Sequence, residues 1–127
     1  MLLESNAEVV GVVGYSLQHW PVTRDRSGWW PHDAEPGEPN TVVIESLRLA
    51  RGVSLSRVRT LLRWPRLVAM ELGLEWVGCR LNEEWCDQAA VERWNADDVL
   101  LWLFWREAFV DIAQKDCLVF LWRNPAY

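Results

Sequence analysis

The chain has 127 residues, of which 50% are hydrophobic and 24% are charged, a composition typical of a globular domain and not of a disordered segment. Its longest wholly apolar run, residues 99–105, is far shorter than the roughly 20 residues that span a bilayer. The N-terminus has no basic segment of the kind that opens a secretory signal. We therefore expect one cytoplasmic domain, residues 1–127, with no membrane partner.

The net charge of −5 conceals a strong asymmetry along the chain. Six arginines and no acidic residue lie between Arg48 and Arg66, whereas the rest of the chain carries 7 basic and 18 acidic residues. A basic segment of this kind offers contacts to an anionic partner, or pairs with the acidic remainder of the same protein.

The three cysteines and two histidines fit neither a disulfide framework nor a metal site. An odd cysteine count favours reduced thiols, and no spacing matches that of a structural zinc site. The sequence also lacks a glycine-rich phosphate loop and a nucleophile elbow. We therefore expect no metal, no cofactor and no identifiable catalytic residue.

The N-terminal third predicts a strand followed by a long loop. Residues 8–17 are rich in valine and contain Gly11 and Gly14, which favours a strand with a bulge or a close backbone approach. Residues 18–40 contain four prolines and two glycines and show no periodicity. They predict a loop long enough to be a candidate functional segment.

Residues 41–72 predict a basic helical segment. Apolar residues recur at helical spacing in residues 41–51 and again in residues 54–64. Pro65 is expected to end the second of these helices and to start a short third one, which Gly73 closes.

Residues 73–127 predict a core of strand, helix, helix and strand. The strands are expected at 73–81 and 117–122, and the first helix at 83–94. Residues 96–115 begin with acidic residues and are apolar nearly all round, which predicts a buried central helix. The expected fold class is therefore α+β, a small single domain with about three strands and four or five helices.

Ten tryptophans are the most unusual feature of the composition, and three of them lie in the 18–40 loop beside arginines. Aromatic and arginine side chains on a proline-stiffened loop favour protein recognition, because little entropy is lost on binding. The candidate partner-binding residues are Trp20, Arg24, Arg26, Trp29 and Trp30. Our first hypothesis is a small non-enzymatic module of inhibitor, immunity or phage counter-defence type, which occludes another protein. The alternative for these tryptophans is that they cap the core.

Two other functions remain open at this stage. A DNA-binding regulator would use a helix-turn-helix-like segment within residues 48–66, and its candidate nucleic-acid-binding residues are Arg57, Arg59, Arg63 and Arg66. Residues 92–103 (ERWNADDVLLWL) resemble the strand-to-helix end of winged or excisionase-type regulators. A small enzyme would instead use the loop residues His19, Asp25, His32 and Asp33. The sequence also leaves a homodimer open.

Overall fold

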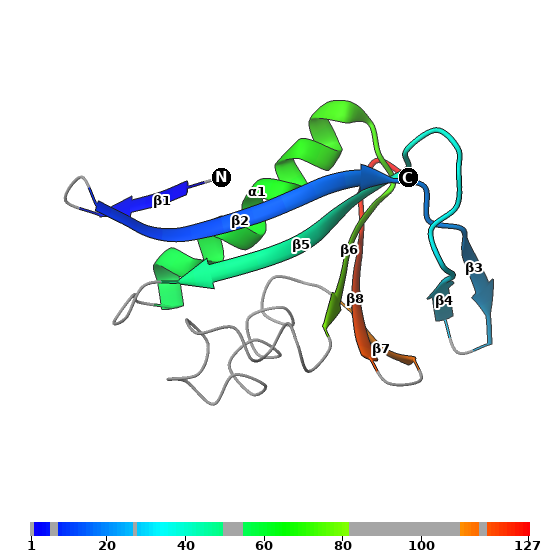
Figure 1. Cartoon of the computed structure of the whole chain (residues 1–127). Coiled ribbons are helices and arrows are strands. Elements are labelled where there is room, and N and C mark those ends of the chain that lie inside the picture. The colour runs from blue at the N-terminus through cyan, green and yellow to red at the C-terminus, as the bar shows by residue number, and fades with distance from the viewer. Residues whose placement is uncertain (1, 6–7, 27, 50–54, 82–109, 115–116) are drawn as a thin grey trace.

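The computed structural model describes residues 2–5, 8–26, 28–49, 55–81, 110–114 and 117–127. Within these ranges the chain forms eight strands and one helix (Figure 1). The strands are β1 (Leu2–Ser5), β2 (Glu8–Gln18), β3 (Val22–Asp25), β4 (Gly28–Pro31), β5 (Thr41–Leu49), β6 (Trp76–Leu81), β7 (Val110–Gln114) and β8 (Cys117–Arg123). The helix is α1 (Leu55–Leu72).

Six strands form the main sheet, in the order β1-β2-β5-β6-β8-β7. All neighbours in this sheet are antiparallel except β5 and β6, which are parallel. Parallel neighbours need a crossover connection, and α1 lies on that connection. The helix crosses one face of the sheet behind β2 and β5 (Figure 1), and it contacts β1, β2, β5 and β6.

The described elements correct the expected fold class, because they contain eight strands and one helix instead of three strands and four or five helices. The strands expected at 8–17, 73–81 and 117–122 are confirmed as β2, β6 and β8. The expected central helix at 96–115 is wrong at its C-terminal end, where β7 pairs with β8. The rest of that helix, the helix expected at 83–94 and the regulator-like residues 92–103 lie outside the described residues.

The helix expected at 41–51 is also wrong, because Thr41–Leu49 form β5. This strand starts with four consecutive β-branched residues, all of them buried. Such residues favour strands, and a strand buried on both faces is apolar without alternation. The same apolar run therefore satisfies a helical period and a buried strand equally well.

The two helices expected around Pro65 are a single helix, α1, with Pro65 inside it. Pro65 is buried together with Leu61, Leu62 and Ala69 on the side of α1 that faces the sheet. Burial of this face stabilises the helix and offsets the hydrogen bond that proline cannot donate. No helix in the described part of the chain is long and apolar enough to cross a membrane.

The loop expected at 18–40 contains a second, two-stranded sheet in which β3 pairs with β4. Gly28 starts β4 with a φ of 122°, a conformation that only glycine adopts readily. The remaining loop, residues 32–40, is exposed up to Pro39 and returns to the main sheet through Asn40, whose side chain bonds to both backbone polar groups of Trp20.

Candidate functional site

The parallel strands β5 and β6 separate from each other halfway along the sheet. They pair from Thr41↔Trp76 to Ile44↔Cys79 and no further. Beyond this point β5 continues along β2 as far as Leu49, and β6 continues along β8 as far as Leu81 (Figure 1). Among the described residues, the pairing of the two parallel strands therefore stops at their carboxyl ends, the edge at which open α/β sheets bind ligands.

A β-bulge lies at the point of separation. Gly14 pairs with Ser46 and Tyr15 with Ile44, so Glu45 is an extra residue of β5 with no partner residue in β2. A bulge bends its strand and redirects the side chain that it carries. A Cβ atom on Gly14 would overlap the hydroxyl of Ser46, so glycine allows the close approach that the bulge requires.

The carboxylate of Glu45 is held by side chains of β2. Ser16 Oγ donates to Glu45 Oε1 at 2.8 Å, and Gln18 Nε2 donates to the same oxygen at 3.2 Å. Gln18 also accepts a hydrogen bond of 3.0 Å from the indole Nε1 of Trp20. Ser16 pairs with Val43, which packs against Trp20, so this network lies on the face of the sheet opposite α1.

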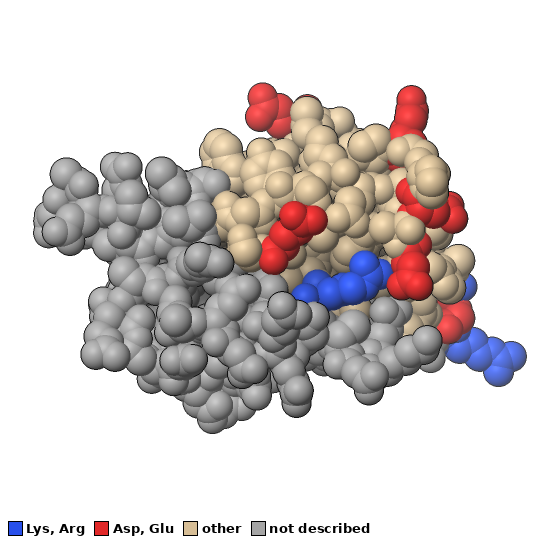
Figure 2. Space-filling view, in the orientation of Figure 1, with Lys and Arg blue, Asp and Glu red and all other residues tan. Residues whose placement is uncertain are grey.

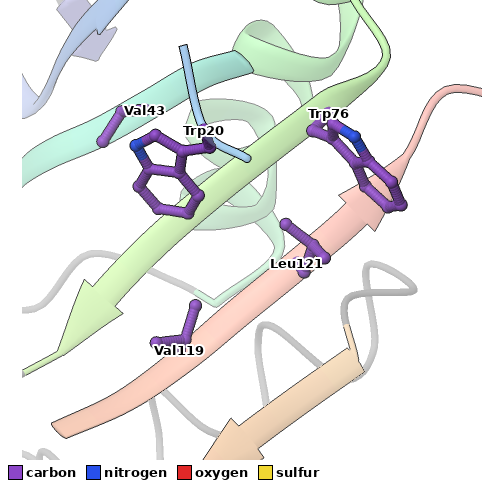
Figure 3. Close-up of a cluster of buried hydrophobic side chains, with 5 residues drawn as sticks. All are labelled: Trp20, Val43, Trp76, Val119 and Leu121. Carbon is purple, nitrogen blue, oxygen red and sulfur yellow. The ribbon is translucent and has the colours of Figure 1, made fainter. Parts of the chain in front are cut away.

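Trp20 forms the floor of this face. Its side chain is fully buried and packs with Val43, Trp76, Val119 and Leu121 (Figure 3). Its six-membered ring lies directly over Gly78, where a Cβ atom would overlap Cζ3 and Cη2 of the indole. The structure therefore places Trp20 in the core, as the capping alternative for the loop tryptophans requires.

Arg80 covers the same indole from outside. Its Cζ atom lies 4.1 Å from the ring centroid of Trp20, and its Nη2 donates to the backbone oxygen of His32 at 2.9 Å. Arg80 follows Cys79, the last residue of β6 that pairs with β5. Glu45 and Arg80 are therefore the first residues beyond the last parallel pair, one on each diverging strand and both on the face opposite α1.

The other candidate partner-binding residues lie on the β3–β4 hairpin. Trp29 packs edge-on against Trp76, with 5.3 Å between ring centroids, and lies between Arg24 and Arg123, whose Cζ atoms are 5.5 and 4.8 Å from its ring. Trp30 is half-buried against the Trp20 cluster, and Arg24 and Arg26 are exposed. The tryptophans thus attach the hairpin to the sheet, and partner binding by this set stays a prediction.

The candidate nucleic-acid-binding arginines lie on a single helix and not on a helix-turn-helix. Arg57 belongs to the first turn of α1, Arg59 is half-buried and Arg63 is exposed. Arg66 is half-buried, with its Cζ atom 5.9 Å from the ring centroid of Trp122. The expected pair of helices is not formed, because residues 41–49 belong to the sheet.

The His and Asp residues proposed for a small enzyme do not form a joint site in the described residues. His19 contacts Glu35 at 3.6 Å and the backbone oxygen of Glu38 at 2.9 Å, whereas His32 contacts the hydroxyl of Thr23 at 2.9 Å. In the described part of the chain, no group of three or more His, Cys, Asp or Glu side chains could hold a metal ion.

Sequence reasoning missed both Glu45 and Arg80. A signal for Glu45 is present, because it is the acid that interrupts the apolar run TVVIESL. No comparable signal marks Arg80, since its proximity to Trp20 and to the end of β5 depends on pairing between distant segments.

Two solved structures share the fold of this chain, a mixed sheet crossed on one face by the helix that joins its two parallel strands. One, from Staphylococcus aureus Mu50 and described as an acetyltransferase, is 16% identical with a TM-score of 0.55, and the match covers 96% of this chain and 69% of that one. The other, an acetyltransferase of the GNAT family from Listeria monocytogenes 4b F2365, is 13% identical with a TM-score of 0.57, and the match covers 96% of this chain and 62% of that one. No protein-family model and no curated protein sequence matches the chain.

This likeness corrects the hypothesis of a non-enzymatic inhibitor, immunity or counter-defence module. At 13–16% identity the likeness shows the fold alone, and the two structures that share this fold are described as acetyltransferases.

Proposed function

We propose that this chain is an acyltransferase that moves an acetyl group from coenzyme A to an amine at the separation of β5 and β6. The observation that carries the proposal is the end of the parallel ladder at Ile44↔Cys79, next to the bulge at Glu45, in a fold shared with two acetyltransferases. We use the word gap for the space between β5 and β6 beyond Ile44 and Cys79. A gap at this position accepts an extended ligand between the two halves of the sheet.

The residues at the gap suit coenzyme A in two respects. Beyond Ile44 the edge of β5 that faces β6 has no strand partner among the described residues, so its backbone groups can pair with the amides of the pantetheine arm as an added strand would. The helix α1 starts close to the end of β5 (Figure 1) and has no acidic residue in its first turn. A helix N-terminus of this kind favours phosphate groups.

Glu45 is the residue in the described part of the chain that best fits the role of general base. The hydrogen bonds from Ser16 and Gln18 hold its Oε1 atom in place at the start of the gap. The acetyl thioester supplies the acyl group, and the acceptor amine must lose a proton as its nitrogen bonds to the carbonyl carbon. Glu45 accepts that proton in our proposal, and the sulfur leaves as the C–S bond breaks.

The test compares Glu45→Gln with the wild type and with Glu38→Gln. Gln keeps the shape of the side chain but accepts protons poorly, so we expect the transfer rate to a panel of primary amines to fall by about 10²- to 10⁴-fold. The affinity for acetyl coenzyme A, measured by calorimetry, should stay unchanged. Glu38 lies in the exposed loop and contacts His19 only through its backbone oxygen in the described residues, so Glu38→Gln should behave as the wild type.

Two outcomes would overturn parts of this proposal. If the wild type does not bind acetyl coenzyme A at millimolar concentration, the proposed function is wrong. If it binds and transfers the acetyl group but Glu45→Gln is as fast as Glu38→Gln, the assignment of the base is wrong.

A further inference from the structure

Arg80 carries a half-buried positive charge with no acidic partner among the described residues. Its guanidinium lies over Trp20 and, among the described residues, donates one hydrogen bond, to a neutral backbone oxygen. On the same face, Arg123 also lies near tryptophan rings, but it forms an ion pair of 3.0 Å with Glu75. Because removing a charge from water is costly unless an opposite charge compensates it, Arg80 is the better candidate for binding an anion.

The stacking on Trp20 prepares the guanidinium for such an anion. Trp20 is fully buried and packed over Gly78, so it cannot move away from below Arg80 without disrupting the core. The bond to His32 fixes one nitrogen of the guanidinium, and its other N–H groups donate to no acceptor among the described residues that an anion would displace. A planar guanidinium held in this way matches a carboxylate, which accepts two parallel hydrogen bonds.

The position of Arg80 links this anion site to the proposed reaction. Glu45 and Arg80 follow the last parallel pair on the two strands and face the same side of the sheet. An amine that approaches Glu45 therefore extends its other end across the gap toward β6. We propose that the acceptor is a primary amine that also carries a carboxylate, and that Arg80 determines this specificity by binding the carboxylate. This inference rests on the proposed function.

The experiment uses the full chain and a series of ω-amino acids (glycine, β-alanine, 4-aminobutyrate and 6-aminohexanoate), each matched with the alkylamine that lacks the carboxylate. We expect the wild type to acetylate at least one amino acid with a kcat/KM at least tenfold above that of its matched alkylamine. In Arg80→Gln this preference should disappear through a rise in KM for the amino acid, with the alkylamine unchanged. Arg63→Gln is the control, because Arg63 is exposed on α1 at the opposite face.

A binding measurement separates the failure of this inference from the failure of the proposed function. Titration of the protein with the same compounds, followed by tryptophan fluorescence, requires no acetyl transfer. Tighter binding of an amino acid than of its alkylamine, lost in Arg80→Gln and kept in Arg63→Gln, would support the carboxylate site even if no amine is acetylated. Equal binding of both compounds, or a preference that survives in Arg80→Gln, would overturn it.

Discussion

Gly78 is the residue on which the packing of the face opposite α1 depends most directly. The indole of Trp20 lies against Gly78, and the Cζ atom of Arg80 lies 4.1 Å from the centroid of the same indole. The buried ring of Trp20 thus contacts both the backbone of β6 at Gly78 and the guanidinium of Arg80. Any side chain at position 78 would lift the ring and move Arg80 with it.

We therefore expect Gly78→Ala to destabilise the protein by about 1–3 kcal/mol, the usual cost of inserting a methyl group into a packed core. The measurement is urea denaturation followed by far-UV circular dichroism. Gly37→Ala is a suitable control, because the added Cβ would lie 3.3 Å from the half-buried ring of His19 at an exposed loop position. Equal losses in the two variants would contradict the close contact between Trp20 and Gly78.

At the scale of elements, the C-terminus of α1 ends in a complete Schellman motif. The backbone nitrogen of Gly73 donates to the oxygen of Met70 at 3.4 Å, and that of Leu74 donates to the oxygen of Ala69 at 2.9 Å. Gly73 has a φ of 70°, which glycine adopts without the steric penalty of a Cβ atom. This cap directs the chain from α1 into β6 and so sets where β6 joins β5.

Replacing Gly73 tests this cap. We expect Gly73→Ala to lower the free energy of unfolding by about 1–2 kcal/mol, because alanine in the left-handed region brings its Cβ too close to the following carbonyl oxygen. Gly73→Asn should cost less, since asparagine tolerates that conformation. Chemical denaturation of the two variants measures the difference, and an alanine variant as stable as the asparagine variant would contradict a left-handed Gly73.

Local sequence patterns predicted some of these elements and not others, for physical reasons. The strand β2 was predictable from its valines, Gly14 indicated the irregular pairing of β2 with β5, and Gly73 marked the end of α1 correctly. The hairpin β3–β4 was not predictable from alternation, because its first strand is exposed except for Val22. It is held by tryptophan and arginine contacts with the main sheet, which no local pattern encodes.

At the scale of the molecule, the sequence could not predict the candidate site, because the site exists only where two distant strands stop pairing. Ile44 and Cys79 pair with each other although α1 lies between them in the sequence. If residues 41–51 formed a helix, Glu45 would lie on an unrelated surface. Figure 2 shows most of the acidic side chains in view on the side of the molecule that carries the β3–β4 hairpin and the loop after it. Asp33, Glu35 and Glu38 are exposed in that loop. The distribution of charged residues therefore gave no indication that the site lies between β5 and β6.

The separation divides the main sheet into two parts, β1-β2-β5 and β6-β8-β7, which are joined by the ladder of four pairs from Thr41↔Trp76 to Ile44↔Cys79. In a ladder, the backbone groups of alternate residues point to the same neighbour. Between Glu45 and Leu49, we therefore expect the amides that point to β2 to be protected from hydrogen exchange, whereas those that point to the gap have no β6 residue opposite them.

This arrangement predicts how ligand binding changes hydrogen exchange. Acetyl coenzyme A should slow exchange at the gap-facing amides of Glu45–Leu49, in alternate positions, because the ligand supplies the hydrogen-bond acceptors that β6 does not. Amides of the β3–β4 hairpin should exchange at the same rate with and without the ligand, since the hairpin attaches to the other end of the parallel ladder, near Trp76. Residue-resolved exchange measured by NMR distinguishes the two regions. Protection of the hairpin without protection of β5 would move the ligand site to the tryptophans and refute a site between the diverging strands.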